Sequence, residues 1–188
     1  MRAVNVSIGA MLCVALGATA FASDGAAPAP VANDGRHDFD FLIGAWEISN
    51  RSLAAGSSEW QEFPAVTVDR SFLGGLGNMD EMTLQKGGEG ISIRFFDPVK
   101  KEWSIYWAST NTRGLISPPV IGHFEGGRGR FYSDDVDADN KPIRVRYTWE
   151  GISATGAHWD QAFSYDGGKT WKVNWNMEFH RRQPPHSP

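Results

Sequence analysis

Five stretches of this sequence alternate between mainly apolar and mainly polar side chains. In residues 91–95, isoleucine and phenylalanine alternate with Ser92 and Arg94. The same spacing recurs in residues 103–107, 143–149, 159–163 and 173–179. A repeat of two is that of a β-strand, and this alternation indicates antiparallel strands with one buried face. The sequence therefore predicts an all-β fold.

Weaker alternation extends the prediction to about ten strands, with further segments at 46–53, 59–63, 66–72, 79–84 and 122–124. Turn sequences rich in Gly, Asp, Asn and Pro join successive strands at 97–100, 126–129, 137–140 and 166–168. A sheet with one apolar face must close on itself or pack against a second sheet. Closure removes the unpaired edges, so we predict a single antiparallel up-and-down β-barrel.

The aromatic content suggests what such a barrel would contain. The 188 residues include 8 tryptophans and 11 phenylalanines, and each such ring can bury roughly 150–250 Å². A barrel of eight or more strands has room for one small ligand. Some of these rings are therefore expected to line a cavity instead of filling it.

A motif near the start of this region resembles the opening of lipocalin and fatty-acid-binding barrels. There, residues 38–46 place a Gly-x-Trp after one helical turn at 37–43. A wider set of motifs is similar to a bacterial family of calycin-like barrels of unknown function, at residues 73–78, 96–98, 103–107, 159–163 and 174–175. The resemblance implies a calycin-like or lipocalin-like barrel with a short N-terminal helical turn, and it implies no particular reaction.

The N-terminus has the pattern of an export signal. Arg2 precedes an apolar run over 6–21, and Ala20-Phe21-Ala22 is a small-x-small cleavage site. We therefore predict a signal peptide at 1–22 and a periplasmic or secreted protein. An Ala- and Pro-rich segment at 23–36 is expected to be a disordered linker, 37–181 the barrel domain, and 182–188 a disordered tail.

Composition and motifs argue against several classes of partner. The formal net charge of −4 disfavours nucleic-acid binding, and no membrane contact is expected after signal cleavage. Cys13, the only cysteine, would leave with the signal peptide. No cofactor or metal is expected, because there is no His-x-His or His-Glu-x-x-His, and the calcium-loop-like stretch from Asp135 lacks the required Glu. Residues 164–171 match an Asp-box, which predicts a structural hairpin.

Candidate ligand-binding residues follow from assuming that the apolar side of each strand faces inward. Three tryptophans then line the interior, namely Trp46, Trp107 and Trp175. Four polar residues share that side, namely Asn50, Glu81, Tyr147 and Gln161. Buried polar groups need partners, so these could bind one another, a buried water or a ligand.

Arginines provide a second set of candidates. Arg94, Arg144 and Arg146 occupy the polar side and are expected to face solvent. If the strand faces are inverted, Arg94 and Arg146 would instead lie inside, where fatty-acid-binding barrels hold a carboxylate.

Three functions remain open. The favoured one is an exported protein that binds a small hydrophobic or aromatic molecule inside the barrel. The first alternative is a cofactor-independent lyase, isomerase or hydrolase, with Glu81 or Tyr147 as the acid or base. The second is an interaction module with a filled barrel. The oligomeric state is left open.

Overall fold

The computed structural model describes residues 34–53, 57–84, 88–112, 114–137 and 139–182. The predicted signal peptide, all but the last three residues of the predicted linker, and the predicted tail after Arg182 lie outside these residues. In the part of the chain that is described, no helix is both long and apolar enough to cross a membrane.

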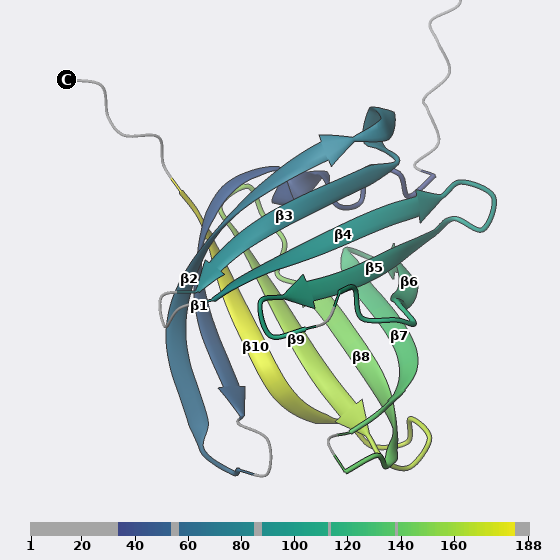
Figure 1. The fold of residues 1–188 in the computed structure, drawn as a ribbon. Coiled ribbons are helices and arrows are strands. Elements are labelled where there is room, and N and C mark those ends of the chain that lie inside the picture. Colours follow the sequence, from purple (N-terminus) through teal and green to yellow (C-terminus); the bar gives the residue numbers. More distant parts are fainter. Residues whose placement is uncertain (1–33, 54–56, 85–87, 113, 138, 183–188) are drawn as a thin grey trace, which may run out of the picture. The chain divides into compact units, whose positions relative to one another are not determined.

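Ten antiparallel strands form one closed barrel (Figure 1). Each strand pairs with its neighbours in sequence, and β1 pairs with β10 to complete the circle. The strands are β1 (Gly44–Leu53), β2 (Trp60–Phe72), β3 (Gly77–Leu84), β4 (Glu89–Asp97), β5 (Glu102–Ser109), β6 (Val120–Glu125), β7 (Arg128–Val136), β8 (Pro142–Glu150), β9 (Gly156–Ser164) and β10 (Lys172–Arg181). Short 3₁₀ turns lie at η1 (Asp40–Leu42) and η2 (Leu73–Gly75). The predicted all-β up-and-down barrel is confirmed.

The number of strands is the predicted one, although two details of the prediction are wrong. The segments predicted at 59–63 and 66–72 belong to one strand, β2, which continues through Pro64. Residues before Ala65 pair with β1 and have no partner in β3, so the missing N–H of proline is tolerated there. The strand β7 was not predicted, because only Phe131 is a large apolar residue among its inward positions.

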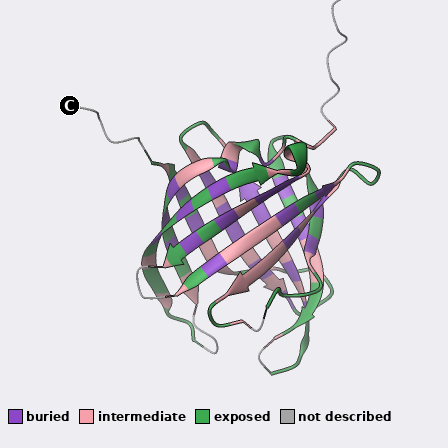
Figure 2. Ribbon diagram, turned by 45° about the horizontal axis from the view of Figure 1, so that its top comes forward, coloured by how far each residue is buried: buried purple, intermediate pink, exposed green. Residues whose placement is uncertain are grey.

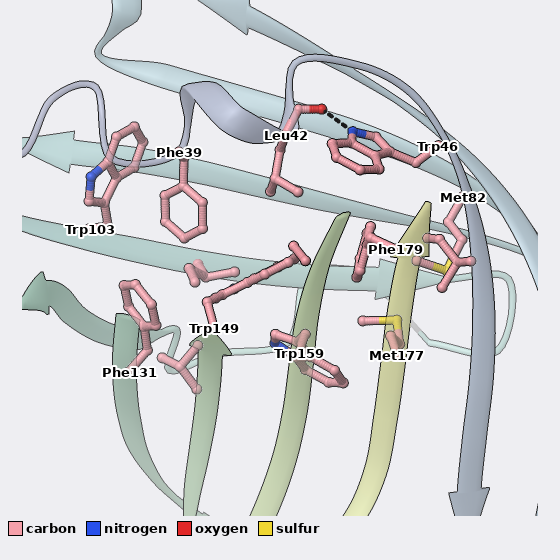
Figure 3. Packing of buried hydrophobic residues seen from close by; sticks show 14 of the residues in the cluster. Phe39, Leu42, Trp46, Met82, Trp103, Phe131, Trp149, Trp159, Met177 and Phe179 are labelled. Atoms are coloured by element: carbon pink, nitrogen blue, oxygen red, sulfur yellow. Dashed lines mark hydrogen bonds between the residues drawn. The ribbon is translucent and has the colours of Figure 1, made fainter. Parts of the chain in front are cut away.

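One end of the barrel is closed by the N-terminal segment 34–43. Phe39 of this segment is fully buried, and its ring contacts those of Trp103 and Phe124 at centroid distances of 5.1 and 5.0 Å. Figure 3 shows the ring pointing into the cluster formed with Phe131 and Trp149. This closed end is the aromatic core that the composition predicts.

Hydrogen bonds hold the plugging segment to the strands. The indole of Trp46 donates to the Leu42 carbonyl at 2.6 Å, as drawn in Figure 3. The indole of Trp103 donates to the Gly35 carbonyl at 2.8 Å. Arg181 donates to the Phe41 carbonyl and stacks over the Trp46 ring at 3.8 Å. The Gly-x-Trp motif thus places Trp46 where it fastens the helical turn to the barrel.

Buried and exposed residues alternate along the strands, as Figure 2 shows. The strand β4 has the opposite orientation from the one predicted. Arg94 is 4% exposed, whereas Phe95 is 40% exposed and packs on the outside against Phe72 and Tyr106. The prediction that Arg94 faces solvent is therefore wrong. Its burial is possible because acidic partners on β2 and β3 face it inside the barrel.

A candidate ligand cavity inside the barrel

A cavity of about 300 Å³ lies inside the barrel and is lined by side chains from β3 to β10. Its inner end is closed by Trp149 and Phe179, which separate it from the plugging segment. Ile116, Pro118 and Asp135 line the cavity and are exposed, so they mark its mouth. The cavity therefore opens at the end of the barrel opposite the N-terminal plug.

The middle of the cavity is walled by aromatic rings. Trp175 stands at an interplanar angle of 89° to both Trp107 and Trp159, with centroid distances of 6.4 and 5.7 Å. The Tyr147 ring meets Trp159 at 5.0 Å and 66°. Edge-to-face contacts of this kind fix the orientation of each ring. Faces of several rings consequently border one space from different directions.

Amide side chains hold two parts of this wall in place. The indole N–H of Trp175 donates to Asn50 Oδ1 at 3.0 Å, and Asn50 is itself buried. Gln161 lines the cavity, and its amide nitrogen donates to Asn174 Oδ1 at 3.2 Å. Asn50 thus positions a wall residue, whereas Gln161 keeps its own oxygen for other contacts.

A buried ionic cluster borders the cavity on its β2–β4 side. The guanidinium of Arg94 donates through Nη1 to Asp69 and Asn78, both at 3.0 Å, and through Nη2 to Asp80 at 2.5 Å. All four residues are buried, and Arg94 and Asp80 line the cavity. One guanidinium therefore serves two carboxylates and an amide.

Burial raises the pKa of Asp69 from 3.8 to about 7. Arg94 lowers this pKa and Asp80 raises it, and neither effect is as large as that of burial. The second oxygen of each carboxylate, Oδ1, has no hydrogen-bond partner. One cation shared between two buried carboxylates cannot offset the cost of burying both negative charges. The pKa of Asp69 is therefore raised in spite of its contact with Arg94.

Burial also raises the pKa of Tyr147, to about 12, with a smaller contribution from Asp135. The phenol therefore keeps its proton near neutral pH. In the cavity it can donate a hydrogen bond to a ligand, and it is a poor general base.

No protein-family model and no curated protein matches this chain. Among solved structures it is similar to an S-type phycobiliprotein lyase, CPES, from Guillardia theta, with 9% identity, 80% of this chain and 96% of that chain covered, and a TM-score of 0.51. Rv2717c from M. tuberculosis has 10% identity, covers 76% and 94%, and has a TM-score of 0.49. EF1p2_mFAP2b bound to DFHBI has 11% identity, covers 79% and 99%, and has a TM-score of 0.40.

The fold is that of a calycin-like barrel. At these identities the similarity extends to the architecture alone, so the site must be interpreted from its own residues.

Five of the predicted ligand-binding residues line the cavity of this calycin-like barrel: Arg94, Trp107, Tyr147, Gln161 and Trp175. Two others are buried behind it. Trp46 belongs to the closed end, and Asn50 touches the cavity wall through Trp175.

The structure places two predicted site residues on the outside. Glu81 is exposed and pairs with Arg70 at 2.9 Å, so its predicted role as an internal acid or base is wrong. Arg146 stacks on the ring of Trp171 at 4.7 Å and lies 3.8 Å from Asp160, on the outer face of β8. The idea that Arg146 joins Arg94 inside the barrel is also wrong.

Sequence reasoning missed several residues that line the cavity, among them Asp80, Trp159 and Asp135. The prediction that Glu81 faces inward implies that Asp80 faces outward, whereas Asp80 and Met82 are the buried residues of β3 and Glu81 is exposed. Trp159 has the inward position that alternation predicts, yet it was not included among the ligand-binding candidates. Pairing with Arg94 would have singled out Asp80, because a buried arginine requires an acid nearby.

The turn motifs form compact hairpins. Asp166 accepts hydrogen bonds from the hydroxyl and backbone N–H of Thr170, from the Ser164 hydroxyl and from the Lys169 backbone, at 2.6–3.0 Å. These bonds lower the pKa of Asp166 to about 2. Asp137 accepts from two backbone N–H groups in the β7–β8 connection, the stretch that resembles a calcium loop. Among the described residues, no three His, Cys, Asp or Glu side chains gather as a metal site would require.

Proposed function

We propose that this protein binds one small hydrophobic or aromatic molecule inside its barrel. The observation that supports this most is the cavity of about 300 Å³ with its tryptophan walls. Small-molecule sites occupy roughly 300–1,000 Å³ and combine apolar walls with a few polar groups. Gln161, Tyr147 and Asp80 provide such groups here. An interior space of this size favours ligand binding over an interaction module with a filled barrel.

The catalytic alternative is weaker. Glu81 faces the outside, and the raised pKa of Tyr147 suits a hydrogen-bond donor better than a base. Binding is therefore the function that the geometry supports best.

Binding can be tested through the tryptophans themselves. Planar one- and two-ring compounds should quench or shift the emission of Trp107, Trp159 and Trp175 and raise the melting temperature. Ser133→Phe would place a ring in the cavity and should abolish this response. Ser49→Phe is the matched control, because Ser49 is exposed on the outer face of β1. A broad panel that leaves both emission and melting temperature unchanged would refute the proposal.

We also propose that the protein is exported to the periplasm or secreted, on the basis of the apolar run at 6–21 and the Ala20-Phe21-Ala22 site. Expression of the full chain in a bacterium should yield a processed protein outside the cytoplasm that begins at Ser23. Deletion of residues 2–22 should retain it inside. Full-length protein found only in the cytoplasm would contradict this proposal.

A further inference from the structure

Acidic groups outnumber basic ones around the cavity. Asp80 and Asp135 line it, and Arg94 is the one cationic residue among the described lining side chains. The two terminal nitrogens of Arg94 already donate to Asp69, Asp80 and Asn78. Its charge is thus already shared between two carboxylates, and only its Nε is a buried donor without a partner. The groups around the cavity therefore carry more negative than positive charge.

Asp80 has unused capacity to accept a hydrogen bond. It is 5% exposed and lines the cavity, and while Oδ2 holds Arg94, Oδ1 has no partner. A buried acceptor without a partner is unfavourable, and a ligand donor would relieve this. The last torsion of an aspartate is soft, so a donor in the cavity can draw this oxygen toward itself.

The aromatic wall also favours a positively charged ligand. Because Trp175 is perpendicular to both Trp107 and Trp159, ring faces and edges meet the cavity from several sides. The face of an aromatic ring is electronegative and attracts a cation, most strongly where water is excluded. Asp135 adds a negative charge at the mouth, where it attracts cations from solution.

We propose that the cavity binds an organic cation: a protonated or quaternary amine carried on an apolar or aromatic body. The amine would lie near Asp80, and the body would pack among Trp107, Trp159 and Trp175. This inference rests on the proposed function and names the class of ligand.

Three probes of one shape test this proposal. We would titrate (2-naphthyl)methylamine, 2-naphthalenemethanol and 2-naphthoic acid into the protein at pH 7.5 and low salt, following tryptophan emission. The ammonium should bind at least tenfold more tightly than the alcohol, and the carboxylate more weakly than the alcohol. Salt should weaken only the ammonium complex. Equal affinities, or a preference for the carboxylate, would overturn the cation inference and leave ligand binding intact. Failure of all three to bind would overturn both.

Adjacent residues on β3 supply a matched pair of variants. Asp80→Asn should reduce ammonium affinity at least tenfold and leave alcohol affinity unchanged. Glu81→Gln removes the same charge from the outer face and should change neither. If Asp80→Asn does not fold, Asp135→Asn at the exposed mouth replaces it, with an expected loss of about threefold for the ammonium alone. Unchanged ammonium affinity in the folded variant would refute the proposal.

Discussion

Asp69 should make the folded protein lose stability as the pH rises. Its pKa is raised to about 7 in the folded state, whereas 3.8 applies to the unfolded chain. Between these values the folded state binds more protons than the unfolded state, so the free energy of unfolding decreases with increasing pH. The stabilisation from this group is full below about pH 4 and is lost as the pH rises through about 7.

The magnitude follows from the size of the shift. One pKa unit corresponds to about 1.4 kcal/mol, so a rise from 3.8 to about 7 sets an upper limit of about 4 kcal/mol. Asp69 is 2% exposed, so solvent screens this effect little. The variant Asp69→Asn keeps the shape of the side chain and an acceptor for Arg94 but does not titrate.

The assay is urea unfolding followed by tryptophan emission at pH values from 4 to 8. The wild-type protein should lose roughly 2–4 kcal/mol more than Asp69→Asn over this range. Subtracting the variant's free energy of unfolding from that of the wild type removes the contributions of other titrating groups, such as Asp166 with its lowered pKa. Glu81→Gln, an exposed carboxyl on the neighbouring strand, should follow the wild type. Parallel curves for wild type and Asp69→Asn would show that the pKa of Asp69 is not raised in the folded protein. So would a variant that is less stable than wild type at pH 8, because the attraction of Arg94 would then exceed the cost of burial.

Three further predictions concern the closed end, the cavity wall and a hairpin. Phe39→Ala should lower the free energy of unfolding by about 3–5 kcal/mol in urea denaturation, because a fully buried ring is lost from the plug; a change near zero would contradict its central packing. Gly90→Ala would place a methyl group against the Trp107 ring. The methyl group should push that ring into the cavity and weaken binding of the naphthalene probes, and unaltered binding would argue against this contact. Asp166→Ala should lower the melting temperature measured by circular dichroism without changing probe affinity, because its bonds lie within its own hairpin; lost affinity would connect the hairpin to the site.

Much of the fold could be predicted because it depends on a local rule. Alternation with a period of two identified β5, β8 and β9 with the correct inward residues, such as Trp107 and Tyr147. It also identified β10 from Trp175 onward, whereas Val173 is exposed because the register shifts between these two residues. The site was harder to predict, because its polar contacts join residues distant in sequence. Arg94 is 25 residues from Asp69, and nothing in either strand alone indicates that they meet.

The orientation of β4 follows from the turn that joins it to β5. The turn between β4 and β5 sets Asp97 opposite Glu102, and this register places Arg94 opposite Ile105. Directly opposed residues share one face of a sheet, so the orientation of β5 determines that of β4. Since Ile105 lies inside with Trp107, Arg94 must lie inside too.

That conclusion changes the electrostatics expected of the interior. An arginine forced inside by register requires acidic partners, and the same rule carried to β3 places Asn78 opposite Arg94 and Asp80 two residues further on the same face. Glu81 then falls on the outside. Register therefore predicts an interior with a neutralised arginine and acidic groups, which favours a cationic ligand. Hydrophobic alternation alone predicts an interior with Glu81 as its charged residue or, if the strand faces are inverted, one with Arg94 and Arg146. The charge of the cavity depends on how strands pair, and the turn lengths that set this pairing are present in the sequence.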